Sequence, residues 1–145
     1  MFSDLISRLF VDAPQTLPDT DARLALTALL VRVARSDGRY DAGERERICR
    51  IVSARYGLTA QAAADLRSDA EVLEGQAPDT VRFTRAIKDA VPLEQRIGVI
   101  EALWSVVLED GQRDEEEDAL MRLVASLLGV SDQDSNSARL RVDRG

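Results

Sequence analysis

The sequence predicts an all-α protein, a compact bundle of about seven helices built from two pseudo-symmetric halves. Its composition favours helices, because the hydrophobic residues (45%) include few of the aromatics (4%) that strands prefer. Apolar residues also recur at the three- and four-residue spacing of amphipathic helices along most of the chain. In addition, one stretch of sequence occurs twice. At 145 residues the chain is expected to be a single domain that folds without a disulfide or a metal.

The repeated stretch centres on an acidic turn. Asp37-Gly38 returns 73 positions later as Asp110-Gly111, and an Asp and a Glu follow at the same distances in both copies. The match extends back to the apolar residues Leu26, Leu30 and Val33, which fall opposite Val99, Leu103 and Val106. It also extends forward, with a one-residue slip, from 56–59 to 128–131. We therefore predict an internal duplication of a helix, a turn and a second helix. Residues 36–44 are called the first acidic turn and residues 109–117 the second.

The chain begins with residues 2–10, whose apolar spacing predicts a short amphipathic helix. Residues 11–18 hold two prolines and form a connector. We expect the short helix to dock on the domain itself. Peripheral contact with a membrane is the alternative, but its polar face carries only Arg8, and membrane-surface helices are usually richer in basic residues.

The first half continues with a strongly apolar helix from Asp19 to the first acidic turn. The next helix is predicted from about Asp41 to Tyr56, and Gly57 closes it. Thr59 is a suitable N-cap for an Ala-rich helix that runs through residue 70.

A break over 71–79 is expected between the two halves. The second half is then expected to contain a helix over 81–91 and a longer helix that has Pro92 as its first residue and ends at Asp110-Gly111. A further helix is predicted over 114–128. The first of these helices is suggested by the apolar residues Val81, Phe83, Ile87 and Val91. Inward-facing residues are assigned in the second, namely Leu93, Ile97, Ile100, Leu103, Trp104, Val107 and Leu108. The final residues, 132–145, are polar, and we expect a frayed or briefly helical tail outside a core of about 20–131.

Composition also narrows the function. The chain has no His and only Cys49, which argues against the usual catalytic triads, a structural zinc site and an internal disulfide. A bound metal would need oxygen ligands, which favours calcium, magnesium or manganese. The net charge of −7 argues against nucleic-acid binding and favours a protein partner with a basic surface. Neither a transmembrane stretch nor a signal peptide is evident, so a cytoplasmic location is expected.

The acidic turns have a purely structural interpretation. Asp41 with Glu44, and Asp114 with Glu117, have the N-cap to N3 spacing of a capping box. Carboxylates in the first turn of a helix are also stabilised by the helix dipole, typically by 0.3–1 kcal/mol each. This interpretation explains the side chains without any ligand.

A functional interpretation starts from the distance between each Asp-Gly pair and the Glu that follows. Glu44 and Glu117 lie six residues after the glycines, which is the spacing in the second half of an EF-hand loop. The earlier ligand positions are Val33 and Arg35 in one copy and Val106 and Leu108 in the other, so an authentic EF-hand is not expected. A metal would be held either in sparse, water-rich sites or by the two turns together.

The two turns differ in charge. Residues 109–118 contain seven acids and one base, whereas residues 36–45 contain three acids and two bases. We expect the second turn to attract cations more strongly, although a solvated charged face would also explain the excess of acids.

These motifs resemble the TerB-like tellurite-resistance family, and the resemblance covers roughly residues 20–131. It implies an all-helical fold of two related halves, a role in stress response or as an interaction module, and no established catalysis. The metal-chelating set that it implies is Asp37, Asp41, Glu44, Asp110, Asp114 and Glu117. Arg39 and Arg45 depart from this picture, because they bring positive charge close to the first turn.

Three functions follow from these observations. The leading one is a non-enzymatic helical module whose acidic face binds a divalent cation, a basic partner, or one through the other. The alternative is a metal-independent scaffold with an apolar groove for a partner helix. The third is a metal-dependent hydrolase, in which Lys88, Tyr40 or a carboxylate would act as acid or base.

Overall fold

The computed structural model describes residues 19–36, 38, 40–76, 80–108 and 115–144. They form the helices α2 (Asp19–Arg35), α3 (Ala42–Tyr56), α4 (Ala60–Gln76), α5 (Thr80–Ala90), α6 (Leu93–Val107), α7 (Glu115–Leu127) and α8 (Asp132–Arg144). No strand occurs within these residues, which confirms the all-α prediction. The helix expected over 2–10 and the connector over 11–18 lie outside the described part of the chain. None of the described helices is both long and apolar enough to cross a membrane.

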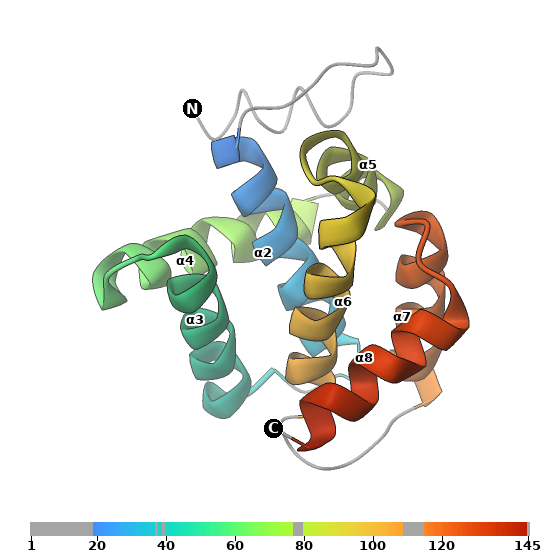
Figure 1. The fold of residues 1–145 in the computed structure, drawn as a ribbon. Helices are drawn as coiled ribbons and strands as arrows, with labels where there is room; N and C mark the ends of the chain where they lie inside the picture. The colour runs from blue at the N-terminus through green and yellow to red at the C-terminus, as the bar shows by residue number, and fades with distance from the viewer. Residues whose placement is uncertain (1–18, 37, 39, 77–79, 109–114, 145) are drawn as a thin grey trace.

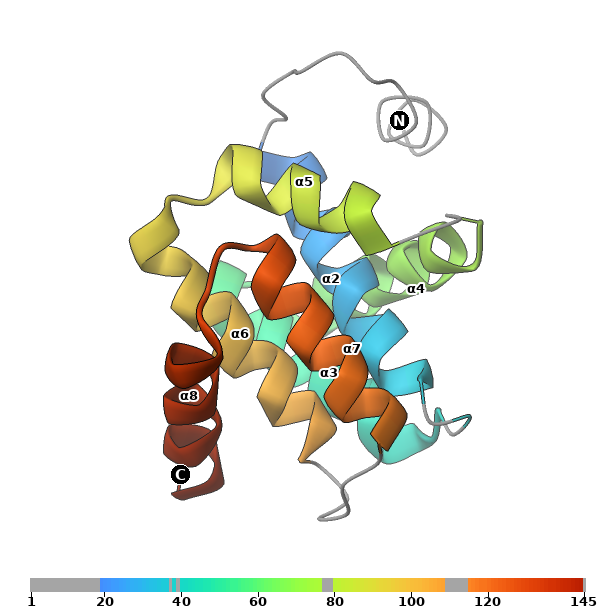
Figure 2. The same cartoon turned by 90° about the vertical axis from the view of Figure 1, so that its right-hand side faces the viewer.

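Helices α2 and α6 lie side by side at the centre of the bundle (Figure 1). α3 and α4 lie on one side of this pair, α7 and α8 lie on the other, and α5 crosses near one end (Figures 1 and 2). α2 is central because its sequence is apolar around most of its circumference. Every residue from Leu24 to Val31 is buried, and even Thr27 is satisfied locally, because its hydroxyl donates to the carbonyl of Arg23 at 2.7 Å.

The packing of the two halves is reciprocal. The first half consists of α2, α3 and α4, and the second half consists of α6, α7 and α8. Within each half the first helix packs extensively on the third, α2 on α4 and α6 on α8. Between the halves, α3 also contacts α6 and α7 contacts α2, so that each second helix packs on the first helix of the other half. This pattern is what a duplicated unit related by a pseudo-twofold axis would produce.

The duplication extends to the way in which α3 and α7 end. Gly57 (φ 64°) follows α3 and Gly129 (φ 74°) lies just after α7, and each adopts the left-handed conformation that favours glycine. The amide of the next residue then returns to the helix, Leu58 to the carbonyl of Ser53 at 3.1 Å and Val130 to that of Ala125 at 2.8 Å. A hydroxyl caps the following helix in both halves, Thr59 for the amide of Ala62 and Ser131 for that of Asp134, each at 3.1 Å.

The prediction of a frayed tail over 132–145 was wrong, because residues 132–144 form α8, a 13-residue helix that packs on α6. Ser131 caps this helix, and Asp132 and Asp134 in its first turn suit the helix dipole. Its buried face is made of small residues, including Ser135 and Ala138. Few large apolar residues mark this face, so the hydrophobic pattern did not reveal it.

The break predicted over 71–79 was also misplaced, since α4 continues to Gln76. Leu73 is fully buried, and Glu74 forms ion pairs with Arg32 and Arg35 of α2. These contacts hold the last turns of α4 against α2 and outweigh the weak helix propensity of Gly75. Of the residues in the predicted break, only 77–79 lie outside those that the structure describes.

The inward-facing residues of α6 were mostly assigned correctly. Ile100, Leu103, Trp104 and Val107 are buried, and Ile97 and Leu108 are half-buried. Leu93 was wrong, because 54% of its surface is exposed. Among the apolar residues that predicted α5, Phe83 and Ile87 are buried and Val91 is half-buried, whereas Val81 is 40% exposed. Leu93 and Val81 are thus the two exposed residues of these sets. Both lie in the first turn of their helix, where the chain is still approaching the core. Pro92 is the N-cap of α6 and not its first helical residue.

Candidate functional site

The six residues of the predicted metal set are only partly visible. Asp37, Asp110 and Asp114 lie outside the described residues, whereas Asp41, Glu44 and Glu117 lie within them. The description therefore covers residues 36, 38 and 40–44 of the first acidic turn, but only residues 115–117 of the second.

Asp41 is the N-cap of α3, as the capping-box interpretation predicts. Its backbone is extended (φ −93°, ψ 179°), and its Oδ1 accepts a hydrogen bond from the amide of Glu44 at 2.9 Å. The other carboxylate oxygen, Oδ2, makes no hydrogen bond to any described residue. One oxygen of Asp41 thus serves the helix, while the second is available to a ligand.

Glu44 and Glu117 occupy equivalent places in the first turns of α3 and α7, and both are buried. Only 6% of Glu44 and 3% of Glu117 is exposed, and neither residue is without an interaction partner. Ionised carboxylates are seldom buried this deeply unless ion pairs, hydrogen bonds or a metal compensate for the lost hydration. Such burial exceeds what a cap requires, because a capping-box side chain works equally well at the helix surface.

The described residues do not by themselves assemble a metal centre. Across the ranges that the structure covers, no three His, Cys, Asp or Glu residues come together closely enough to hold an ion. Asp41 and Glu44 meet only through the cap hydrogen bond. The convergence of the two turns on a shared ion stays a prediction, since half of the proposed ligands lie outside the described ranges.

Positive charge surrounds the entry to α3. The guanidinium carbons of Arg35 and Arg45 lie 5.0 and 5.5 Å from the centre of the Tyr40 ring, and Arg45 Nη1 donates to the carbonyl of Tyr40 at 2.9 Å. The sequence had indicated Arg45 as a departure from a cation site, and the structure adds Arg35. A cation bound at the first acidic turn would have to overcome this repulsion.

Two acids of α4 lie near these arginines. Glu74 pairs with Arg32 at 3.1 Å and with Arg35 at 2.5 Å, and these contacts join α2 to α4. Glu71 pairs with Arg67 at 3.4 Å within α4 itself. Sequence reasoning missed them because it placed Glu71 and Glu74 in a break between helices.

Tyr40 belongs to the same network, and its hydroxyl donates to Glu71 Oε2 at 2.5 Å. Burial, followed by the hydrogen bond to Glu71 and the charge of that carboxylate, raises the pKa of Tyr40 well above its usual value near 10, although Arg67 and Arg35 oppose the shift. The stability contributed by a raised pKa is fully present below the unfolded-state pKa and is lost as the pH rises toward the folded-state pKa.

We therefore expect the free energy of unfolding to fall above about pH 10, by up to about 1.4 kcal/mol per pH unit from this one group. Urea unfolding at a series of pH values measures the fall. Subtracting the same series for Tyr40→Phe isolates the contribution of Tyr40. Parallel curves for the protein and Tyr40→Phe would contradict this assignment.

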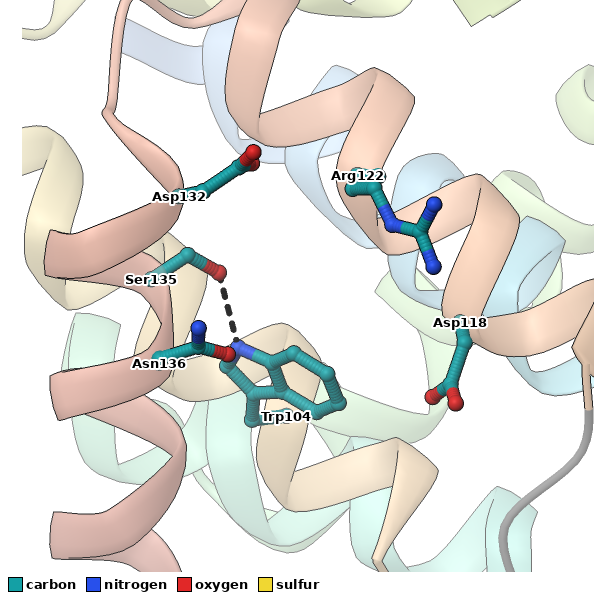
Figure 3. A pocket seen from close by; sticks show the side chains of 6 residues that line it. All are labelled: Trp104, Asp118, Arg122, Asp132, Ser135 and Asn136. Carbon is teal, nitrogen blue, oxygen red and sulfur yellow. Dashed lines mark hydrogen bonds between the residues drawn. The ribbon is translucent and has the colours of Figure 1, made fainter.

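A polar pocket of about 210 Å³ lies beside the first turn of α7 (Figure 3). Its lining residues come from α6, α7 and α8, namely Trp104, Asp118, Arg122, Asp132, Ser135 and Asn136. Trp104 Nε1 donates to Ser135 Oγ at 3.1 Å, which fixes the indole as one wall. Asp118 is the last of the seven acids in residues 109–118, so one of these acids lines the pocket.

Sequence reasoning missed this pocket because half of its lining comes from α8. A usable signal was present, since Ser131 follows Gly129-Val130 just as Thr59 follows Gly57-Leu58, and Thr59 had been assigned as a helix cap. Extending the repeat by one helix would have predicted α8.

The comparison with known protein families also includes most of α8. The family model described as "Tellurite resistance protein TerB" matches residues 23–140, from the first turns of α2 to the middle of α8. No curated protein and no solved structure shows a significant match to the chain.

Proposed function

Because the chain belongs to the family of the tellurite resistance protein TerB, we propose that it is a non-enzymatic, cytoplasmic stress-response and interaction module whose acidic turns bind a divalent cation. The observation that carries the proposal is the burial of Glu44 and Glu117 at equivalent positions of a duplicated turn. A carboxylate that is repeated, buried and next to further acids has the character of a ligand more than that of a surface charge.

The proposed ligands fit a hard cation. Asp37, Asp41, Glu44, Asp110, Asp114 and Glu117 offer only oxygen, the donor that calcium, magnesium and manganese prefer. Asp41 supports this fit, because its Oδ2 is not used by the cap that Oδ1 provides. A bound cation would supply the positive charge that balances the acids gathered at each turn.

We expect the second acidic turn to bind more tightly than the first. Arg35 and Arg45 lie beside the first turn, and two further carboxylates, Asp118 and Asp132, line the pocket next to the second. The same carboxylates favour a protein partner with a basic surface at this end of the molecule. Tyr40 would be a poor general base, because its raised pKa keeps the phenol protonated, and this supports a binding role over hydrolysis.

Calorimetric titration of chelator-treated protein with calcium, magnesium and manganese tests the proposal. We expect saturable binding of at least one ion, reduced at least tenfold in the double variant Asp110→Asn, Glu117→Gln and less in Asp37→Asn, Glu44→Gln. A tenfold change corresponds to about 1.4 kcal/mol, less than one charge-assisted ligand contact contributes.

The matched control is Asp65→Asn, Asp69→Asn, which removes two exposed acids from α4 and leaves the turns intact. It should bind like the unmodified protein. Absence of heat with all three ions at millimolar concentration, together with turn variants that are merely less stable, would reduce the turns to helix caps and favour the metal-independent scaffold.

A further inference from the structure

Two arginines from different helices meet on one aromatic ring, far along the chain from the acidic turns. The guanidinium carbon of Arg23, in α2, lies 4.7 Å from the centre of the Tyr56 ring, and that of Arg55, at the end of α3, lies 5.9 Å from it. Stacking of a guanidinium on an aromatic ring is favourable and restricts its orientation. Tyr56 therefore holds two positive charges close to each other.

Neither of these guanidinium groups has an acidic partner among the residues that the structure describes. Several other arginines do have an acidic partner, as Arg32 and Arg35 have in Glu74 and Arg141 has in Glu101. Two like charges held together without a carboxylate repel each other, which is unexpected in a chain of net charge −7. An anionic ligand would relieve this repulsion.

The two arginines open onto a pocket of about 230 Å³. Its polar lining consists of Arg23, Arg55, Tyr56 and Gln95, and its other walls are Ala22, Ala90 and Val91. None of these described lining residues is acidic. This surface is called the arginine pocket. Its lining contrasts with that of the pocket beside the second acidic turn, where two carboxylates face one guanidinium.

The start of α6 borders the arginine pocket. Gln95 lies in the first turn of α6, and the N-cap Pro92 provides no side-chain acceptor for the amides of that turn. Glu94 in the same turn offsets part of the helix dipole, so the positive charge of the pocket comes mainly from the two arginines. Arg55 lies along the same helix, because its Nη1 is 3.5 Å from the place where a side chain at Gly98 would begin.

We propose that the arginine pocket binds the phosphate group of a small molecule. Guanidinium groups present paired N–H donors that match phosphate oxygens, and a phosphate dianion would neutralise both arginines at once. The volume suits a phosphate with a small organic substituent. The site shares no residue with the acidic turns, so it stands or falls independently of cation binding there.

Calorimetric titration of the full chain with inorganic phosphate and with glycerol phosphate tests this proposal. We expect one saturable site for both probes, with an affinity at least tenfold lower in Arg23→Gln, Arg55→Gln, because each lost charge-assisted contact corresponds to tenfold or more. The charge-matched control is Arg50→Gln, Arg141→Gln, which removes two exposed arginines from ion pairs elsewhere. The affinity of this control for both probes should stay within about twofold of that of the unmodified protein.

A second pair of variants tests the site without removing either arginine. Gly98→Asp would place a carboxylate beside Arg55 and should abolish phosphate binding, whereas the equally large but neutral Gly98→Asn should weaken it less than threefold. Both side chains begin at ordinary van der Waals distance from Arg55, so neither should prevent folding.

Three results would overturn the proposal. The first is the absence of saturable heat with either probe at millimolar concentration. The second is an equal loss of affinity in the arginine-pocket variant and its charge-matched control. The third is binding to phosphatidic acid vesicles without binding to the soluble probes, which would assign the pocket to a membrane surface.

Discussion

A chain that ends at residue 131 is expected to lose at least about 3 kcal/mol of its free energy of unfolding, a large part of the 5–15 kcal/mol typical of a domain. Trp104 is only 4% exposed, and Ser135 of α8 accepts the hydrogen bond from its indole nitrogen. Truncation would leave the indole without that acceptor and expose part of a large aromatic surface, whose full removal from a core costs 3–5 kcal/mol.

Urea unfolding followed by circular dichroism measures this loss, and the single tryptophan offers a second signal, since its emission should shift to longer wavelength when α8 is missing. A point variant, Ala138→Asp, should destabilise in the same direction, because it places a charge where the side chain has no exposed surface. Leu140→Ala, at a position that is 44% exposed, is the control and should change stability by less than about 0.5 kcal/mol. Equal stability of the truncated and full chains would restore the view that residues 132–145 are a tail.

Replacing Phe83 with Ala is expected to cost about 3–5 kcal/mol, because the ring is fully buried between α5 and the rest of the core. The same ring supports polar contacts, since the guanidinium carbon of Arg32 lies 5.0 Å from its centre. Arg32 in turn binds Glu74 at 3.1 Å and the hydroxyl of Thr80 at 3.4 Å. Phe83 thus both fills the core and positions the arginine that joins α2 to α4 and α5.

Chemical denaturation of three variants separates these contributions. Phe83→Leu keeps most of the volume and should cost less than Phe83→Ala, whereas Val81→Ala, at an exposed position of the same helix, should cost about 0.5 kcal/mol or less. If Phe83→Ala were no more destabilising than Val81→Ala, α5 would not be packed on the core as the structure has it.

Features that depend on a few neighbouring residues could be predicted from the sequence. The cap at Asp41, the glycine end of α3 at Gly57 and the cap at Thr59 are local hydrogen-bonding patterns, and all three are confirmed. The repeat was visible for a similar reason, because short stretches of matching sequence reveal it. Predictions failed where a contact between distant segments decided the outcome. α4 extends to Gln76 because Glu74 binds α2, and α8 is held by Ser135 against a tryptophan 31 residues earlier.

In the candidate site, too, features set by neighbouring residues could be predicted, whereas features set by contacts between distant segments could not. The acids of the turns are evident in the sequence, but the burial of Glu44 and Glu117 depends on how α3 and α7 pack. The arginine pocket was missed entirely, because Arg23 and Tyr56 are 33 residues apart and no periodic pattern joins them. Charge counting along the chain had indicated where cations would be attracted, but it could not show where two arginines gather without acids.

The reciprocal packing of α3 on α6 and of α7 on α2 also bears on how the protein is made. On the ribosome, α2 emerges before the other described helices, and its apolar surface is only partly covered by α3 and α4. The remaining contacts, from α5, α6 and α7, are available only after residues 80–127 have been synthesised. Contacts between segments this distant form late in folding, so the first half must carry exposed apolar surface while the second is being translated. Duplication has therefore produced two interlocked halves that depend on each other, and the nascent chain is most vulnerable to aggregation or chaperone capture in the interval between them.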